Sequence, residues 1–238
     1  IVSMEEVSGL PEYQYKQGKS ASALWGLEAI GYFKDEADIA NSPYQTFQAV
    51  QPGDVKFKDQ NNDSIIDAQD NIVIGNTIPQ WTLGFVGTAN YRGFDLQFVL
   101  SGMVGRTVYV TNNSMWVLQN NNKATDIAYG AWEKGVNEDN ASYPRLTTLS
   151  NKNNYNNSSL WAKSGDFIRL TNLEVGYSLP AKVLAKIKLK QVRFFVNACN
   201  LFSLDSMKEF NLDPEVPDAG VSGYPVMKVY NTGVNVNF

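Results

Sequence analysis

The sequence predicts an all-β, antiparallel protein, and three observations carry this prediction. Five segments alternate between apolar and polar residues, as strands with two different faces do. The connections between these segments are alternately short and long. No apolar run reaches the roughly 18 residues that a transmembrane helix needs. Together the observations favour strands of a membrane-spanning β-barrel, whose short turns and long loops lie at opposite ends. A soluble antiparallel sandwich, with the same period along its strands, remains the alternative.

The first two expected strands form a hairpin. Residues 81–91, WTLGFVGTANY, place aromatic and aliphatic side chains at every second position, and residues 93–105, GFDLQFVLSGMVG, repeat the pattern. Only an Arg-Gly pair connects their alternating segments, which is typical of a tight hairpin turn.

Three more strands follow a long polar stretch at 107–164. Residues 167–180 and 192–202 alternate in the same way, and the segment between them predicts one or two helical turns with Pro180 at the first helical position. A second polar loop, at 203–223, precedes the alternating stretch VYNTGVNVNF at 229–238. The expected organisation is therefore an outer-loop region at 1–78 and barrel strands with their turns and loops at 79–238.

Five strands cannot close a bacterial barrel, because single-chain barrels have even numbers of strands. An open sheet edge in lipid would leave backbone groups without hydrogen-bond partners. On the membrane interpretation, we expect the chain to be the C-terminal part of a larger barrel.

Composition restricts the chemistry. The chain has no histidine, so the commonest general base and the commonest metal ligand are both missing. The net charge of −4 gives no indication of a nucleic-acid partner. A single cysteine, Cys199, leaves the redox compartment open.

An acidic segment at 59–70, DQNNDSIIDAQD, has the spacing of a calcium-binding loop. The expected ligands are five side chains and one backbone carbonyl: Asp59, Asn61, Asp63, Ile65 (carbonyl), Asp67 and Asp70. Ser64 stands where such loops have glycine, and Asp70 is shorter than the usual glutamate, so we expect weak Ca²⁺ or Mg²⁺ binding. No organic cofactor is expected, and a solvated acidic loop is the alternative.

The order of several motifs resembles the late region of the SusC-like (RagA-like) TonB-dependent outer-membrane transporters. The resemblance covers residues 24–238 and lies in PGDVKFKDQNNDSIIDAQDNIVIGNTIPQWTLGF, NYRGFDLQFVLSGMVGRTVY, GAWEKGVNEDNASYPRL, SSLWAKSGDFIRLTNLEVGYSLPAKVL and VRFFVNACNLFSL. It implies the C-terminal strands of a transmembrane barrel of about 22 strands in the bacterial outer membrane.

The resemblance also implies a function and partners. Members of this family import oligosaccharides or peptides, with energy relayed by the TonB complex, and usually carry a SusD-like surface lipoprotein as a lid. The upstream barrel, its plug, the N-terminal segment that engages TonB and the residues that select the nutrient would all lie outside this sequence. The turns at 92–93 and 180–191 would face the periplasm, and the long loops would face outward.

The last strand resembles the signal that the barrel assembly machinery recognises in outer-membrane proteins. Its aromatic terminus follows apolar residues at alternate positions, and the residues expected to carry the signal are Tyr230, Val234, Val236 and Phe238. An ordinary terminal strand that packs inward is the alternative.

Two other classes of function stay open. The first is a soluble β-sandwich that acts as a calcium-binding surface or adhesion module, with residues 59–70 as its centre. The second is a secreted glycan-active enzyme, for which Glu133, Glu138 and Asp139 would have to supply paired carboxylates. Charged residues in a polar loop are usually solvated, so no enzymatic activity is expected. The asparagine-rich stretch NKNNYNNSS is likewise expected to be a polar loop.

Overall fold

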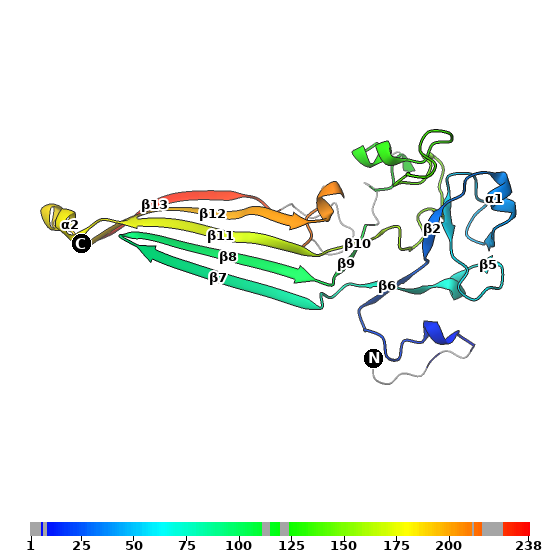
Figure 1. Cartoon of the computed structure of the whole chain (residues 1–238), viewed down its shortest axis with the longest axis horizontal. Coiled ribbons are helices and arrows are strands. Elements are labelled where there is room, and N and C mark those ends of the chain that lie inside the picture. The colour runs from blue at the N-terminus through cyan, green and yellow to red at the C-terminus, as the bar shows by residue number, and fades with distance from the viewer. Residues whose placement is uncertain (1–5, 7–8, 111–114, 120–123, 211, 216–225) are drawn as a thin grey trace. The chain divides into compact units, whose positions relative to one another are not determined.

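The computed structural model describes residues 6, 9–110, 115–119, 124–210, 212–215 and 226–238 (Figure 1). Strands dominate, and the helices are few and short. The strands are β1 (Ala23–Gly26), β2 (Ala29–Tyr32), β3 (Tyr44–Gln45), β4 (Val55–Phe57), β5 (Ile65–Ile66), β6 (Ile72–Asn76), β7 (Trp81–Tyr91), β8 (Phe94–Val104), β9 (Thr107–Tyr109), β10 (Ala162–Ser164), β11 (Phe167–Ser178), β12 (Gln191–Asp205) and β13 (Val229–Asn237). The helices are η1 (Glu12–Gln14), α1 (Glu36–Ala40), η2 (Ala68–Asp70), η4 (Asp126–Gly130), α2 (Ala181–Ile187) and η5 (Met207–Phe210).

The described residues form two compact units. We call one the loop unit, which contains the described residues of 6–78 and 106–164, and the other the sheet unit, which contains those of 79–105, 165–215 and 226–238. The described residues of the polar stretch at 107–164 thus pack with the N-terminal part of the chain, a grouping that the sequence pattern did not indicate.

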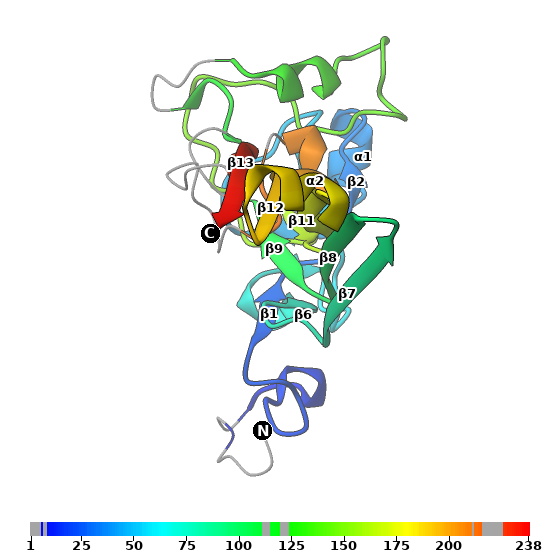
Figure 2. The ribbon, with the colours of Figure 1, turned by 90° about the vertical axis from the view of Figure 1, so that its left-hand side faces the viewer.

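The sheet unit contains one antiparallel sheet of five strands, in the order β13-β12-β11-β8-β7 (Figure 1). All five alternating segments predicted from the sequence are strands of this sheet. In Figure 2, which views the chain from the end that carries α2, β13 and β7 lie at opposite edges of the sheet. Among the described strands, β7 pairs only with β8 and β13 only with β12.

The turns of the sheet unit follow from local sequence. Arg92 and Gly93 connect β7 to β8, and both have positive φ (47° and 89°), which the tight turn requires and which glycine adopts without strain. The predicted helical turns between β11 and β12 are α2, but Pro180 is its N-cap rather than its first residue, because its ψ of 147° is extended. Lys188 ends α2 in the left-handed conformation.

The loop unit has a small apolar core and short sheets. Leu27, Val55, Phe57 and Ile66 are each at most 1% exposed, and partly buried apolar side chains such as Phe47 and Leu160 pack against them. The described residues of this unit form four two-stranded sheets: β1 with β6, β2 with β4, β3 with β5, and β9 with β10.

None of the helices in the described part of the chain has the length and apolar composition needed to cross a membrane.

Candidate functional site

One face of the five-stranded sheet is apolar along its whole length. Paired residues of neighbouring strands share a face, so the register defines rows across the sheet. One row joins Tyr91, Phe94, Tyr177, Phe194 and Val234, with the rings of Phe94 and Tyr177 4.6 Å apart. Further rows on the same face contain Ala89, Leu96, Val175, Val196 and Thr232, and Phe85, Leu100, Leu170 and Phe202.

This apolar face is largely uncovered. The exposed fractions of Phe85, Val196 and Tyr230, on three different strands, are 59%, 56% and 66%. Contiguous apolar surface of this extent on a protein marks an interaction surface or contact with a membrane. The face therefore requires an apolar environment that the described residues do not supply.

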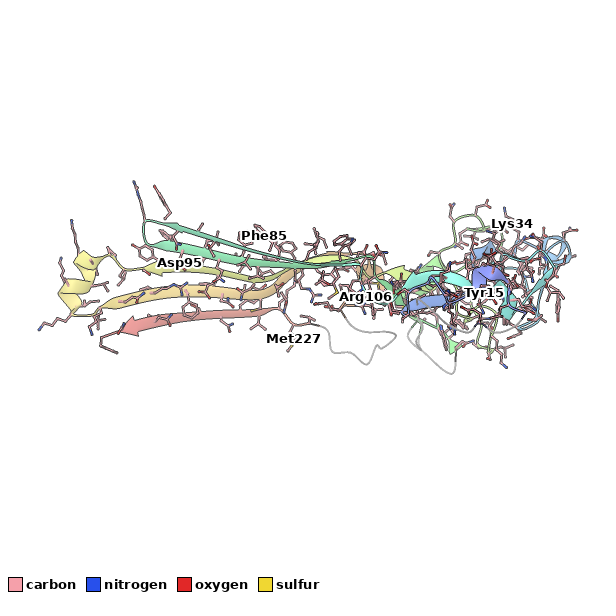
Figure 3. All side chains as sticks on the ribbon, turned by 90° about the horizontal axis from the view of Figure 1, so that it is seen from below. Tyr15, Lys34, Phe85, Asp95, Arg106 and Met227 are labelled. Atoms are coloured by element: carbon pink, nitrogen blue, oxygen red, sulfur yellow. The ribbon has the colours of Figure 1, made fainter. Side chains whose placement is uncertain are left out.

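The opposite face is polar, and an ion cluster lies on it across β8, β11 and β12, near the end of the sheet that carries the 92–93 turn. The guanidinium of Arg193, on β12, donates to both carboxylate oxygens of Asp95 on β8, with an Nε–Oδ1 distance of 3.0 Å. It also donates to Glu174 on β11 at 2.6 Å. Asn197 extends the cluster by donating to Asn172 at 2.9 Å. Figure 3 shows side chains projecting from both faces of the sheet, with Phe85 and Asp95 labelled on the neighbouring strands β7 and β8.

A glycine makes the reach of Arg193 possible. Arg193 and Asp95 lie on strands separated by β11, and Gly176 of β11 is directly paired with Asp95. A Cβ atom built on Gly176 would lie 2.4 Å from Nη2 of Arg193 and 2.5 Å from Oδ2 of Asp95. The bare backbone of Gly176 is therefore the surface across which the ion pair forms.

A second arginine connects the sheet to the segment that follows β12. Arg169, on β11, has a side chain that is only 5% exposed. It donates to both carboxylate oxygens of Asp213 at 2.8 Å and also pairs with Glu215. These contacts fix the segment at 212–215 against the end of the sheet.

The residues predicted to carry the assembly signal lie along β13. Tyr230, Val234 and Val236 share the apolar face, since their partners on β12 are Ala198, Phe194 and Val192. Phe238 follows the last residue of the strand and is 79% exposed.

The predicted cation loop holds its carboxylates by hydrogen bonds to the loop's own backbone. Asp59 accepts from Asn62 N and Ser64 N, at 2.6 and 2.8 Å, and Asp63 accepts from Ile65 N at 2.8 Å. Ser64 has a φ of 65°, the left-handed conformation for which such loops use glycine. Ser64, at the sixth position of the segment 59–70, thus makes the sharp turn that calcium-binding loops make with glycine.

The other end of this loop folds into η2. Asp67 is its N-cap, accepting from Gln69 N at 2.7 Å, and Asp70 accepts from Asp67 N at 2.9 Å, which completes a capping box. Asp70 is fully buried and Ile65 is 42% exposed, while Asn61 hydrogen-bonds to Asp63 at 2.8 Å. Among the described residues, no cluster of three or more His, Cys, Asp or Glu side chains is arranged to hold a metal ion.

The three acidic residues considered for glycan hydrolysis have separate surroundings. Asp139 pairs with Lys34 at 2.7 Å, and both side chains are mostly exposed. Glu138 accepts from Gly135 N at 2.6 Å. The backbone amide of Glu133 donates to Asn137 at 2.8 Å. Glu133 and Glu138 therefore make local contacts, whereas Asp139 makes a long-range ion pair.

The loop unit contains a buried polar network that the sequence pattern did not predict. Asp54 is fully buried and accepts from Nε of Arg145 at 2.7 Å and from the amides of Asn151 and Asn154, both at 2.9 Å. Asn153 donates to the carbonyl of Val55 at 2.9 Å. The asparagine-rich stretch is therefore a loop whose residues Asn151, Asn153 and Asn154 are buried and hydrogen-bond to Asp54 and to the carbonyl of Val55. The only sequence feature that marks this network is the high number of asparagines in the stretch at 151–159.

Aromatic side chains surround this network. The rings of Trp116 and Tyr155, Tyr155 and Trp161, and Tyr143 and Trp161 are 4.9, 5.8 and 5.7 Å apart. Burial raises the pKa of Tyr143 and Tyr155 above the ordinary value of tyrosine. Burial likewise raises the pKa of Tyr32 to about 12. The interior of the loop unit therefore strongly favours neutral phenols.

The chain is similar in sequence to TonB-dependent receptors. It is 25% identical over 247 residues to TonB-dependent receptor P26 of Formosa agariphila, in an alignment that covers 99% of this chain and 24% of that protein. TonB-dependent receptor P39 of the same organism is 29% identical over 211 residues, which cover 80% of this chain and 19% of the relative. The chain thus spans about a quarter of the length of the curated relatives it matches. No protein-family model matches the chain.

Solved structures of a peptide importer share the fold. A chain of the RagAB peptide transporter superposes with a TM-score of 0.67 at 21% identity, over 91% of this chain and 22% of its own length. The RagAB peptide importer in its 'open-open' state gives a TM-score of 0.64 at 23% identity, over the same 91% of this chain and 22% of its own. The resemblance to SusC-like, TonB-dependent transporters that the sequence motifs indicated is therefore confirmed.

Proposed function

We propose that this chain is a section of the wall of a TonB-dependent importer in the bacterial outer membrane. The single observation that carries the proposal is the five-stranded antiparallel sheet with one uncovered apolar face and one polar face. In a transmembrane barrel the apolar face contacts lipid and the polar face lines the lumen. The sequence relatives of this chain are TonB-dependent receptors, and they indicate which class of barrel it belongs to.

Strand lengths support a membrane crossing. The five strands have 11, 11, 12, 15 and 9 residues in chain order. A tilted strand needs about 9–11 residues to cross the hydrocarbon core. Every strand of the sheet is thus long enough, or nearly so, and β12 extends beyond the membrane at one end.

The outer edges of β7 and β13, which pair with no further strand among the described residues, support a larger barrel. An unpaired edge within lipid costs several kcal/mol for each backbone group, so neighbouring strands of the whole protein would pair with both edges. The proposed barrel has about 22 strands.

Orientation follows from the connections. The turn at 92–93 and the α2 connection lie at one end of the sheet, and short turns face the periplasm in such barrels (Figure 1). The segments of the loop unit join strands at their other ends, at residues 79, 105 and 165. We place the loop unit on the extracellular side, where a SusD-like lipoprotein and the imported peptide or oligosaccharide would bind.

Purification of the whole protein from outer membranes tests this proposal. We expect the protein to require detergent and to retain a surface lipoprotein, identified by mass spectrometry of the purified complex. Recovery of the folded protein from the soluble fraction without detergent would overturn the proposal and favour the soluble calcium-binding module.

A further inference from the structure

A small pocket lies where the segment after β12 meets the start of β13. Its lining contains cationic, polar and apolar side chains, all from the sheet unit: Arg169, Asn200, Phe202, Ser203, Lys208, Asp213, Val226 and Lys228. Its volume is about 160 Å³. That is the space of several water molecules at about 30 Å³ each, which is enough for a small ion or a headgroup.

The charges of this pocket are unbalanced. Arg169 is saturated by Asp213 and Glu215, but Lys208 and Lys228 form no ion pair with any residue that the structure describes. The lining contains three cations, Arg169, Lys208 and Lys228, and one carboxylate, that of Asp213. Of the neighbouring carboxylates, Glu215 pairs with Arg169 and Asp205 accepts from the hydroxyl of Ser203, so neither is bonded to Lys208 or Lys228. Two lysines that line one pocket repel each other unless an anion lies between them.

Local contacts hold the pocket in shape. Lys208 donates to the carbonyl of Ser203, and the amide of Asn200 donates to the carbonyl of Met227 at 3.2 Å. Arg169 fixes the segment that carries Asp213. Lys208 and Lys228 therefore line the pocket from segments that these hydrogen bonds hold to β12.

We propose that this pocket binds a phosphate group, with Lys208 and Lys228 as its cationic donors. A lysine ammonium is a compact point charge that suits phosphate oxygens. A phosphate would supply the anion that Lys208 and Lys228 lack among the described residues. The phosphate belongs either to a free solute or to an anionic lipid headgroup. The pocket also contacts apolar surface, since Phe202 and Val226 in its lining are 47% and 40% exposed. This inference does not depend on the proposed transport role.

Calorimetric titration of the whole protein in detergent tests the pocket. One arm adds inorganic phosphate, and a second adds short-chain phosphatidylglycerol, with the matching phosphate-free diacylglycerol as its reference. The test variant is Lys208→Gln combined with Lys228→Gln. The control is Lys182→Gln combined with Lys186→Gln, which removes the same charge from exposed positions of α2.

We expect the dissociation constant to rise at least tenfold in the test variant and to stay unchanged in the control. If inorganic phosphate binds and the test variant weakens this binding, a free phosphate is enough to occupy the pocket. If only the phospholipid binds in this way, the pocket is a site for a lipid headgroup. Equal binding by all three proteins, or no binding in either arm, would overturn the inference. Thermal unfolding of each variant verifies that it is folded.

Discussion

At the scale of single residues, Gly176 is the position that allows the ion pair of the polar face to form across β11. Its missing side chain leaves the space in which Arg193 reaches Asp95 across β11. Gly84 is the natural comparison, because it also faces the polar side, on β7, and a Cβ atom there would contact nothing within 4 Å.

Gly176→Ala is expected to destabilise the protein by about 2 kcal/mol, since a charge-assisted hydrogen bond contributes about 1.5–3 kcal/mol. Gly84→Ala should change stability by less than about 0.5 kcal/mol. Urea unfolding of both variants in lipid vesicles, followed by tryptophan fluorescence, measures the difference. Equal stability of the two variants would show that the crossing ion pair contributes nothing.

In the loop unit, the ion pair between Arg145 and Asp54 can be tested in the same way. Removing the arginine by Arg145→Met leaves Asp54, which is fully buried, without its charged partner. Breaking a buried pair in this way costs about 3–5 kcal/mol. The exposed pair of Lys34 and Asp139 serves as the control, and Lys34→Met should leave the unfolding transition where it is. A transition unmoved by Arg145→Met would mean that the asparagines alone hold Asp54.

At the scale of elements, the strands of the sheet could be predicted from sequence and the interior of the loop unit could not. Alternation is a local property, so residues 81–91 revealed their two faces without a partner. The burial of Asn151, Asn153 and Asn154 depends on residues about 100 positions earlier in the chain, including Asp54 and Val55. An asparagine looks the same in a sequence whether water or a carboxylate satisfies its amide.

Part of the candidate site also could not be predicted from the sequence. The polar and apolar faces followed from the alternation, but the contact between Arg193 and Asp95 requires the register of three strands and the gap at Gly176. The segment at 59–70 showed its acidic spacing plainly. Its hydrogen bonds to backbone amides, and the left-handed Ser64, depend on the folded turn.

The cation loop gives a prediction at this scale. If residues 59–70 bind Ca²⁺ weakly, added Ca²⁺ should raise the unfolding temperature of the whole protein, by the stabilisation that a ligand of the native state confers. Asp59→Asn combined with Asp63→Asn should abolish the increase, and Ser64→Gly should preserve it. Differential scanning calorimetry with Ca²⁺ and with EDTA measures the effect. An identical unfolding temperature under both conditions supports a loop that is held by its own hydrogen bonds.

The buried tyrosines of the loop unit predict an alkaline transition. Burial raises the pKa of Tyr32 to about 12 and that of Tyr143 and Tyr155 in the same direction. Folding therefore favours the neutral phenols, and this contribution is complete below pH 10 and is lost as the pH rises toward 12. Absorbance at the tyrosinate band, measured together with circular dichroism, should show these phenols ionising only as the loop unit unfolds. Their ionisation near pH 10 in folded protein would contradict their burial.

At the scale of the whole molecule, a sheet with two chemically different faces occurs in a chain whose relatives are TonB-dependent receptors. We propose that lipid covers the apolar face of this sheet and water its polar face. The chain contains one cysteine, Cys199, which lies on the polar face because it pairs with Asn172 of β11. Leu96, on β8, and Val196, on β12, face the other side.

The most direct measurement is spin-label accessibility in the whole protein reconstituted into vesicles, with cysteines outside this chain replaced. One protein is labelled at Cys199, and two others carry Leu96→Cys or Val196→Cys in a Cys199→Ser background. The labels at 96 and 196 should be relaxed mainly by oxygen, which concentrates in lipid, and the label at 199 mainly by a water-soluble nickel complex. Preferential relaxation of all three labels by the nickel complex would show that water reaches both faces, and the sheet would then not be part of a membrane wall.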